Sequence, residues 1–486
     1  MFGVWSSSQD VAWPAYLGLY ALQHRGEESA GIAVSDGTAI VVRRGMGLVR
    51  DVFDESALST QPGRLAIGHC RYSTTGPSVW QNAQPMLSAI PSGNIALGHN
   101  GNLVNTRQLA ELVRTWTNSA DSDVSSDTLV LTALFARPES GSPRNGGRES
   151  GPRALEETAL SVLPLLRGSF SLTFMDERTL FAARDPQGFR PLVLGKTGSG
   201  WVVASETAAL HAVGSDVVRE VEPGEMIAID ERGVRSHRFA AATPRGCVFE
   251  YVYLARPDSM IAGRGIHATR IRAGMRLAAE QPAEADLVIA VPDTGIPAAL
   301  GYAQASGIPY GQGLIKNSYV GRVFLKPSRA VRQQVMPLKL IPITEVIAGH
   351  RVVVIDDSVV HGNTQRAIVA MLREAGATEV HVRIASPPVT WPCFYGVNLA
   401  SRPDLIAVNR TFAEISALIG ADTMGFISLS GLVESTGLPA SRLCRACFDG
   451  EYPEPPDADT GDRPHVASSG VRRPSSSSTS ANSDGS

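Results

Sequence analysis

Hydrophobic and polar residues follow two different rhythms along the chain, and the change comes near residue 240. Before it, short apolar runs bounded by turn residues predict strands at Leu65–Gly68, Ile95–His99, Ser169–Met175, Leu180–Arg184 and Trp201–Ser205. A helix is predicted over Val11–His24. This pattern is typical of an antiparallel, sheet-rich domain with a few helices.

Beyond residue 280 the pattern becomes one of strand, turn and helix. Apolar runs at Asp286–Val291 and Arg351–Ile355 predict buried strands, and Val380–Ile384 alternates as a third. Helices are expected at Pro297–Ser306 and from Thr364 to a stop at Gly376. Because strands and helices alternate, this half is predicted to fold around a parallel, doubly wound sheet.

Two segments carry little that a core could bury. Pro138–Pro152 is rich in Gly, Pro and Ser, which predicts a mobile surface loop. Tyr452–Ser486 carries Pro, Asp and a run of Ser, which predicts disorder. We therefore expect one domain over residues 1–235, a second over 245–450 and a disordered tail over 452–486.

The composition is that of an ordinary soluble globular protein. Of the 486 residues, 43% are hydrophobic and 19% charged, and the formal net charge of −3 gives no basic excess that would suggest nucleic-acid binding. No apolar stretch reaches the ~18 residues that cross a bilayer. The first residues, Met1–Trp5, lack the layout of a secretory signal. These features predict a cytoplasmic protein with no membrane partner.

The most informative motif is Val352–Thr364, with the sequence VVVIDDSVVHGNT. A buried strand here delivers two carboxylates, Asp356 and Asp357, to the carboxyl edge of a parallel sheet, where such folds bind ligands. The turn that follows opens a helix, whose backbone N–H groups suit a phosphate. Carboxylates beside a phosphate loop suit a sugar phosphate with Mg²⁺. The alternative is a strand end whose acids merely face solvent.

This motif resembles the signature of the type I phosphoribosyltransferases. The flanking segments Val291–Phe324 and Cys247–Ser259 resemble the glutamine amidophosphoribosyltransferases of that group, as do the sequences HVRIASPP and PCFYG. The resemblance implies a Mg²⁺ site and a site for phosphoribosyl pyrophosphate (PRPP). The implied Mg²⁺ contacts are Thr294, Asp356 and Asp357, and the implied PRPP contacts are Lys316, Lys339, Ser358, Gly362 and Thr364. The Val323–Lys339 stretch would belong to the region that closes over PRPP.

The first half is similar to the class II glutamine amidotransferases, which are N-terminal-nucleophile hydrolases with an αββα sandwich. The similarity lies in LGLYALQHRGEESAGIAVSDG, GHCRYSTTG, GHNGNL and SDT. It implies that Arg71 pairs with the glutamine carboxylate, that Asn100 and the Gly101 N–H form an oxyanion hole, and that Asp127 holds the substrate amino group. Taken singly, Arg71 could be a surface charge and Asn100-Gly101 a hairpin turn.

The catalytic cysteine of that family is absent from residue 1. The family begins Cys-Gly-Val-Phe-Gly, whereas this sequence begins Met1-Phe2-Gly3-Val4. We expect the cysteine two positions upstream of Met1, with the start of the chain misassigned. The alternative is a true loss, which would leave a transferase that takes free ammonia. Cys70 cannot replace the nucleophile because it is internal and has no α-amino group of its own.

The other four cysteines, Cys247, Cys393, Cys444 and Cys447, include one C-x-x-C pair. Four thiolates fit either zinc or an iron–sulfur cluster, and the residues alone leave these two open. The resemblance to the iron–sulfur-containing branch of the amidophosphoribosyltransferases implies a [4Fe–4S] cluster. The remaining alternatives are a thioredoxin-like use of the C-x-x-C pair and four unrelated buried thiols.

The sequence departs from the family pattern at several positions. Ser318, Pro337 and His361 stand where cations are usual, and Leu129 stands where a Glu is usual. Lost cations should weaken PRPP binding, since each charge-assisted contact contributes about 1.5–3 kcal/mol. His361 could still donate to phosphate when protonated.

The resemblance implies an enzyme that makes 5-phosphoribosylamine, glutamate and pyrophosphate from PRPP, glutamine and water, the first step of de novo purine (IMP) synthesis. A diverged relative that uses ammonia and a non-catalytic relative are the alternatives. Inhibition by purine nucleotides and assembly into a homotetramer are also implied.

Overall fold

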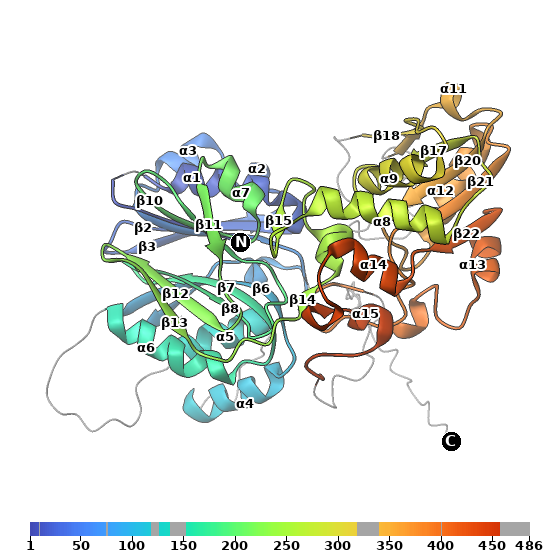
Figure 1. Ribbon diagram of the computed structural model, residues 1–486. Coiled ribbons are helices and arrows are strands. Elements are labelled where there is room, and N and C mark those ends of the chain that lie inside the picture. The colour runs from blue at the N-terminus through green and yellow to red at the C-terminus, as the bar shows by residue number, and fades with distance from the viewer. Residues whose placement is uncertain are drawn as a thin grey trace, which may run out of the picture.

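The computed structural model describes residues 1–8, 10–73, 76–117, 126–136, 152–317, 340–399 and 401–456. Two domains lie side by side: an N-terminal one with two antiparallel sheets and a C-terminal one with a parallel sheet (Figure 1). Among the described residues, none of the helices combines the length and the apolar character needed to cross a bilayer.

The first sheet of the N-terminal domain has seven antiparallel strands. In spatial order they are β11 (Asp216–Glu220), β9 (Val193–Lys196), β10 (Gly200–Ala204), β1 (Phe2–Ser6), β4 (Leu65–Arg71), β2 (Ser29–Ser35) and β3 (Ile40–Met46). Its outer face is covered by α1 (Ala12–Ala21), α2 (Val49–Val52), α3 (Glu55–Ser59) and α7 (Thr207–Ala212). A short 3-10 turn, η1 (Gln23–Arg25), follows α1.

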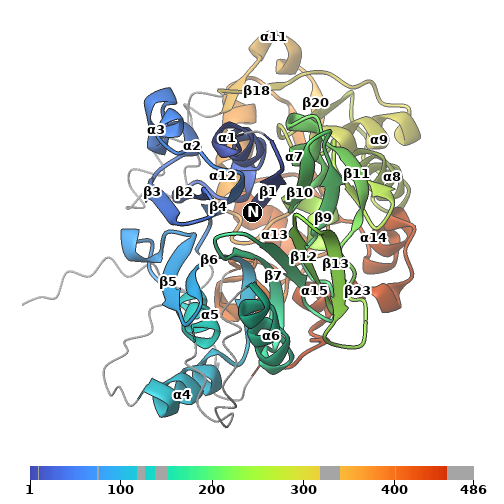
Figure 2. The same cartoon turned by 90° about the vertical axis from the view of Figure 1, so that its left-hand side faces the viewer.

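The second sheet has six antiparallel strands and lies beneath the first. In spatial order they are β13 (Gly233–Arg238), β12 (Glu225–Asp230), β8 (Leu180–Arg184), β7 (Gly168–Met175), β6 (Gly93–Leu103) and β5 (Met86–Ile90). Its outer face is covered by α4 (Thr106–Thr117), α5 (Asp127–Phe135) and α6 (Pro152–Val162). Figure 2 shows these helices on the side of the domain opposite α1 and α7.

A separate core fills the space between the two sheets, with Ile67, Met175 and Leu180 among its fully buried members. Strands β4, β7 and β8 are buried along their whole length, and the apolar run of β8 is accordingly continuous, whereas β7 alternates small polar and apolar residues. Helix, sheet, sheet and helix thus form four layers, and the predicted αββα sandwich is confirmed.

The C-terminal domain is built on four parallel strands. Their order is β17 (Leu287–Ala290), β20 (Arg351–Asp356), β21 (Glu379–Ile384) and β22 (Thr423–Phe426). One face packs against α8 (Ile266–Glu280), α9 (Ile296–Ser306) and α14 (Leu429–Thr436). The other face packs against α11 (Thr344–Ile347), α12 (Asn363–Glu374) and α13 (Phe412–Ile419). Helices on both faces confirm the predicted doubly wound sheet.

Several short elements lie at the junction of the two domains, within the second domain or near the end of the described chain. They are β14 (Gly246–Cys247), the π-helix η4 (Glu250–Leu254), β15 (Met260–Ile261), β16 (Arg264–Gly265), β18 (Leu314–Lys316), β19 (Leu340–Pro342), β23 (Leu443–Cys444) and α15 (Ala446–Asp449). Strand β14 pairs in parallel with β23, which places the start of the second domain beside its end.

Two sequence-based boundaries need correction. The helix predicted over Val11–His24 begins at Ala12, ends at Ala21 and continues as a 3-10 turn. Disorder does not begin at Tyr452, because its hydroxyl donates to the Pro392 carbonyl at 2.7 Å and the next residues pack with it. Most of the predicted Pro138–Pro152 loop, and the tail from residue 457, lie outside the described residues.

Helices α8 and α9 touch backbone to backbone through two glycines. A Cβ at Gly274 of α8 would lie 1.9 Å from the Ala298 carbonyl oxygen, and one at Gly301 of α9 would lie 2.0 Å from the Ile271 carbonyl oxygen. Neither position can hold a side chain unless the helices separate. This contact fixes α8 against α9, and α9 begins directly after the loop that carries Thr294.

We expect Gly274→Ala to lower the free energy of unfolding of the second domain by about 1–3 kcal/mol, because the added methyl overlaps a main-chain oxygen that cannot rotate away. Urea titration followed by circular dichroism would measure the change.

Gly198→Ala is the matched control, since a Cβ there meets nothing within 4 Å. Its effect should stay within about 0.5 kcal/mol. Equal effects of the two substitutions would contradict the role of the helix contact.

Candidate active site

The two aspartates of the central motif lie where strand β20 ends, at the carboxyl edge of the parallel sheet. Both are buried, with 7% of each exposed. Asp356 accepts hydrogen bonds from the Gln365 side-chain amide at 2.7 Å and from the Asp357 backbone N–H at 2.8 Å. These contacts fix one carboxylate against the first turn of α12.

Asp357 is held by two hydroxyls. Thr294, in the loop after β17, donates to one carboxylate oxygen, and the Ser358 hydroxyl donates to the other at 2.5 Å. Helix α12 then starts at Gly362, whose φ of +78° is left-handed and whose Cβ would meet Ile406 at 2.3 Å. No side chain caps this helix, so its first N–H groups can serve a bound anion.

The electrostatics of this edge favour a bound cation. Burial, together with the neighbouring Asp357, raises the pKa of Asp356 well above its ordinary value. Burial also raises the pKa of Asp357, against the hydroxyls of Ser358 and Thr294 and the charge of Arg270. Two buried carboxylates side by side resist ionisation, and a divalent ion would relieve that cost.

The other predicted contacts of this site are only partly brought together. Lys316, at the end of β18, forms an ion pair with Asp293 in the loop that also carries Thr294. Ser358 is half-buried and Thr364 is exposed in the first turn of α12, beside the exposed His361. Lys339, Ser318 and Pro337, with the rest of Val323–Lys339, lie outside the described residues.

In the N-terminal domain, Arg71 and Asp127 are buried near each other. Arg71 ends β4 and lies 3.6 Å from a carboxylate oxygen of Glu28. Asp127 begins α5, and its carboxylate lies 3.4 Å from His99 Nδ1 and accepts from the Leu103 N–H at 3.4 Å. Burial opposes its charge, but His99 and these hydrogen bonds hold the pKa of Asp127 below its ordinary value. A negative and a positive group at fixed positions suit a zwitterionic ligand.

Asn100 and Gly101 lie within strand β6 rather than in a hairpin turn, so the turn alternative is wrong. Gly101 has a φ of +153°, and a Cβ there would lie 2.1 Å from the Ser169 carbonyl oxygen. A glycine is therefore required at this point of the strand. The same strand carries His99, which contacts Asp127, so the implied oxyanion and amino-group sites share one element.

The four cysteines of the second domain lie near one another and come from three segments, although among the described residues no three His, Cys, Asp or Glu side chains are close enough to hold one ion. Cys247 pairs in register with Cys444 across β14 and β23, and Cys447 follows in α15. Burial, and then the charges of Cys393, Cys247 and Cys444, raise the pKa of the Cys447 thiol. Cys70 lies apart, in the core beneath α1, where burial raises its pKa to about 12. It packs there as part of the core.

The loop that carries Cys393 also contacts the strand that carries Gly101. The Asn102 side-chain amide donates to the Phe394 carbonyl at 2.9 Å. A Cβ at Gly396 would lie 2.9 Å from the Gly101 carbonyl carbon, so the two backbones touch. This part of the second domain therefore supports the strand that bears the implied oxyanion hole.

Comparisons with known proteins agree on both halves. Residues 69–212 match the family model of the glutamine amidotransferase domain, and residues 265–385 match that of the phosphoribosyl transferase domain. The amidophosphoribosyltransferase of Mycobacterium tuberculosis is 57% identical over 462 residues, covering 93% of this chain and 86% of that protein. The Bacillus subtilis amidophosphoribosyltransferase is 44% identical over 472 residues, covering 96% of both. The chain belongs to the amidophosphoribosyltransferase family.

A solved structure agrees with this assignment. The B. subtilis glutamine PRPP amidotransferase, complexed with ADP and GMP, matches with a TM-score of 0.85 and 44% identity, covering 94% of this chain and 98% of that one. The two domains of the chain are thus those of the family, a glutamine amidotransferase domain followed by a phosphoribosyltransferase domain.

A buried network of charges joins the two domains, and sequence reasoning missed it. Arg25, after α1, pairs with Glu206 at the start of α7 and, at 2.7 Å, with Glu250 of η4. Arg190 pairs with the same Glu250 at 3.1 Å and donates to the Tyr395 carbonyl at 3.0 Å. Burial acts to lower the pKa of Arg25, but Glu206 and Glu250 raise it above its ordinary value. Both arginines therefore stay charged.

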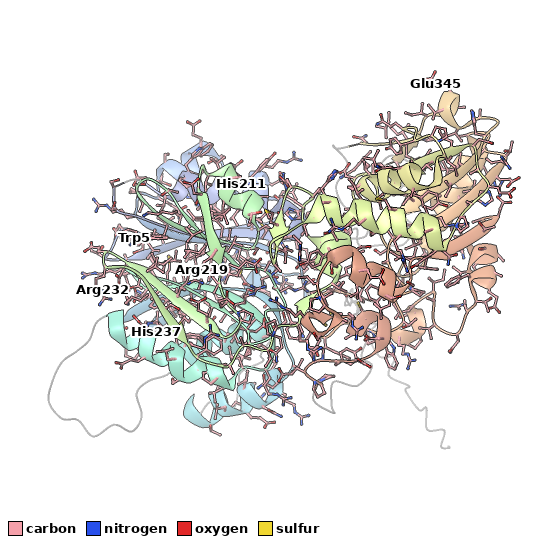
Figure 3. All side chains as sticks on the ribbon, viewed as in Figure 1. Trp5, His211, Arg219, Arg232, His237 and Glu345 are labelled. Carbon is pink, nitrogen blue, oxygen red and sulfur yellow. The ribbon has the colours of Figure 1, made fainter. Side chains whose placement is uncertain are left out.

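The second domain reaches back to this network through Glu206. Its carboxylate accepts from the Arg256 backbone N–H at 2.9 Å and from the Ser259 hydroxyl at 2.6 Å. By contrast, Arg232 pairs with Asp230 at the end of β12, and His237 of β13 pairs with Glu156 of α6, far from the domain boundary (Figure 3). Arg25 lies in the quoted QHRGEE motif, but no local pattern links it to Glu250, 225 residues later.

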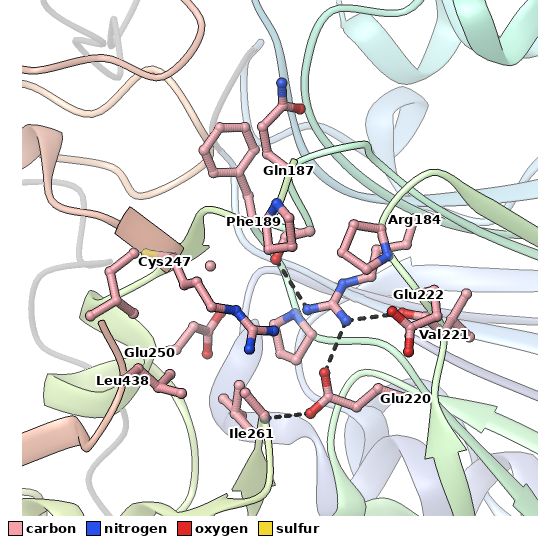
Figure 4. Close-up of a pocket in the computed structure, with 18 of the residues that line it drawn as sticks. Arg184, Gln187, Phe189, Glu220, Val221, Glu222, Cys247, Glu250, Ile261 and Leu438 are labelled. Atoms are coloured by element: carbon pink, nitrogen blue, oxygen red, sulfur yellow. Dashed lines mark hydrogen bonds and ion pairs between the residues drawn. The ribbon is translucent and has the colours of Figure 1, made fainter. Parts of the chain in front are cut away.

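A cavity of about 270 Å³ lies beside this network, between the two domains (Figure 4). Phe189, Cys247 and Glu250 line one side, and Arg184 and Glu220 line another. The Arg184 guanidinium is held by Glu220 and by the Val221 carbonyl, each at 3.0 Å. The charges that face the cavity are thus largely paired within the protein.

We expect Glu250→Gln to lower the free energy of unfolding by about 3–5 kcal/mol, since it leaves the buried Arg190 without a carboxylate partner. Chemical unfolding monitored by tryptophan fluorescence would measure the loss.

Glu451→Gln serves as its control. Glu451 pairs with Arg445 at 3.5 Å, but its side chain is 80% exposed. This change should cost less than about 1 kcal/mol. A Glu250→Gln protein as stable as the control would show that the network is dispensable.

Proposed function

We propose that this chain makes 5-phosphoribosylamine from PRPP, with glutamine as the source of nitrogen. The observation that carries the proposal is the pair Asp356–Asp357 at the carboxyl edge of the parallel sheet, with Thr294 and the uncapped start of α12 beside it. Membership of the amidophosphoribosyltransferase family supports the same activity.

In the transferase half, the residues of this edge would hold the sugar phosphate in place. Asp356 and Asp357 accept from the ribose hydroxyls, while the backbone N–H groups of Ser358–Thr364 hold the 5′-phosphate. The nitrogen of ammonia then bonds to the ribose C1, the bond from C1 to the pyrophosphate oxygen breaks, and that electron pair leaves with pyrophosphate. The ammonia nitrogen gives up one proton in the step.

A Mg²⁺ ion bound by Asp357, Asp356 and Thr294 would neutralise charge on the leaving pyrophosphate. Two carboxylates and a hydroxyl suit Mg²⁺, which takes one or two carboxylates and completes its shell with substrate oxygens and water. Among the described residues, no three His, Cys, Asp or Glu side chains converge on one ion, so substrate would have to supply the rest.

In the glutaminase half, Arg71 would pair with the glutamine carboxylate, and Asp127 with its amino group. Asn100 and the Gly101 N–H would stabilise the oxyanion. Hydrolysis in this family needs a cysteine with a free α-amino group, and residue 1 of this sequence is Met. A transferase that draws on free ammonia is the alternative function, and a parallel assay with glutamine separates the two.

We also propose that Cys247, Cys393, Cys444 and Cys447 hold a [4Fe–4S] cluster. The Tyr395 N–H donates to Cys393 Sγ at 3.3 Å, the kind of contact that stabilises a thiolate. Arg190 is close enough to Cys247 and Cys393 for their charges to act on it, and its buried Nε finds no hydrogen-bond partner among the described residues. An unpartnered cationic donor there suits an anionic group. When bound, the cluster would cross-link three segments of the chain.

Zinc is the alternative for these cysteines. One zinc ion would draw the four sulfurs to within roughly 3.8 Å of one another. A cluster places each thiolate on a different iron and so accepts a wider spacing.

The solved B. subtilis relative carries ADP and GMP, and we propose that purine nucleotides also bind this chain. A homotetramer and a cytoplasmic location are proposed on the family resemblance alone.

The function is tested by pyrophosphate release from PRPP with Mg²⁺ and ammonia, in the absence of glutamine. We expect steady release by the unaltered chain and a loss of roughly a hundredfold or more in Asp357→Asn, because a proposed ligand of the Mg²⁺ ion that neutralises the leaving group is removed. This assay does not depend on the glutaminase nucleophile.

Asp404→Asn, at an exposed position of the same domain, should leave that rate unchanged within about twofold. No release by the folded, unaltered chain would refute the transferase and leave a binding protein.

Metal analysis tests the cluster. Protein purified without air should contain about four irons and four sulfides per chain. Cys393→Ser should lose most of both, because one thiolate ligand is replaced by a hydroxyl.

The matched control is Cys70→Ser, a buried cysteine outside the group, which should keep its iron and sulfide. Zinc at one per chain would replace the cluster proposal with its alternative. Protein without metal would overturn both.

A further inference from the structure

Arg270 of helix α8 lies beneath the carboxyl edge of the parallel sheet and is 3% exposed. Its Nε donates to the Tyr251 carbonyl at 2.8 Å, and its Nη2 donates to the Ala255 carbonyl at 2.8 Å. Both carbonyls belong to η4 and its end, the segment that carries Glu250 of the interdomain network. Two of the guanidinium nitrogens therefore hold the π-helix.

The third nitrogen of the guanidinium is not used in holding the π-helix. Nη1 of Arg270 is buried and has no hydrogen-bond partner among the described residues. Arg270 lines a cavity of about 10 Å³ together with Thr294 and Asp357. A space of that size accepts a single water molecule, which could accept from Nη1 and donate to the carboxylate.

Charge links Arg270 to both sides as well. Arg270 is a buried cation, and the carboxylates of Asp357, Glu206 and Glu250 all act on its charge in the same direction.

Holding η4 in place uses only two of the three guanidinium nitrogens. It does not account for the unpaired Nη1 of an arginine that lines the same cavity as Asp357. A buried unpaired donor costs stability unless something satisfies it. A ligand-bound carboxylate edge, with its added negative charge and ordered water, would satisfy it.

We propose that Arg270 is a positioning residue for PRPP binding, which holds Asp357 through the small cavity and ties it to the interdomain helix η4. The proposal rests on the transferase activity proposed above. It adds a residue that touches neither substrate nor metal, and it gives the PRPP edge and the interdomain network one shared cation.

The test compares Arg270→Gln with Arg270→Lys in ammonia-dependent pyrophosphate release and in titration calorimetry of PRPP with Mg²⁺. Arg270→Gln removes the positive charge that lies across the small cavity from Asp357. The KM and the Kd for PRPP should therefore rise roughly tenfold. Arg270→Lys keeps the charge but not the fork, so its values should fall between those of Arg270→Gln and the unaltered chain.

Arg276→Gln is the matched control, because Arg276 lies on the same helix with its side chain 45% exposed and paired with Glu280. Its PRPP affinity should match that of the unaltered chain. A purely structural role for Arg270 would lower the melting temperature of both Arg270 variants and leave the PRPP Kd of the folded protein unchanged.

Unchanged PRPP affinity in folded Arg270→Gln, or in folded Arg270→Lys if the first variant does not fold, would overturn the positioning role. If the unaltered chain itself neither binds nor turns over PRPP, the proposed function fails first. That result is distinct, because it appears before any substitution is made.

Discussion

The two domains depend on one buried carboxylate, Glu250, held between Arg25 and Arg190. All three side chains are nearly excluded from solvent, so none can exchange its partner for water. Burial of such charges gains little net stability when they are well paired, but it is costly when one partner is missing. The network therefore acts mainly as a constraint on geometry, because the domains can meet only where each charge finds its counterpart.

That constraint connects the two candidate sites through a chain of packed residues. On one side, Arg190 holds the loop that carries Cys393, and that loop touches the strand that carries Gly101. On the other, η4 presents its carbonyls to Arg270, which faces Asp357. A short stretch of chain between the domains is thus packed against both the glutamine half and the PRPP half. A movement of η4 would therefore displace residues that contact both sites.

Much of this architecture could be read from the sequence, because its signals are local. Continuous apolar runs such as Arg351–Asp356 are the mark of strands buried on both faces, and the carboxylates that follow them mark the ligand edge. The interdomain elements were missed for the opposite reason. Helix α8 has a polar face and no proline or capping signal, and η4 takes its form from contacts with Arg270. Pairs such as Arg25 and Glu250 have no periodicity that would link them. The first residues of the predicted tail were misjudged, since Tyr452 bonds to the Pro392 carbonyl and Glu454 pairs with Arg167.

The glycine contact between α8 and α9 limits which amino-acid substitutions this sequence can accept. A clash between two side chains can be cured by a smaller residue on the partner helix. At Gly274 and Gly301 each helix meets a main-chain oxygen of the other, and every amino acid carries that oxygen. No second substitution can make room, so neither glycine has a compensating partner. We infer that these two positions tolerate less variation than the larger residues around them, although they contribute almost no side-chain surface of their own.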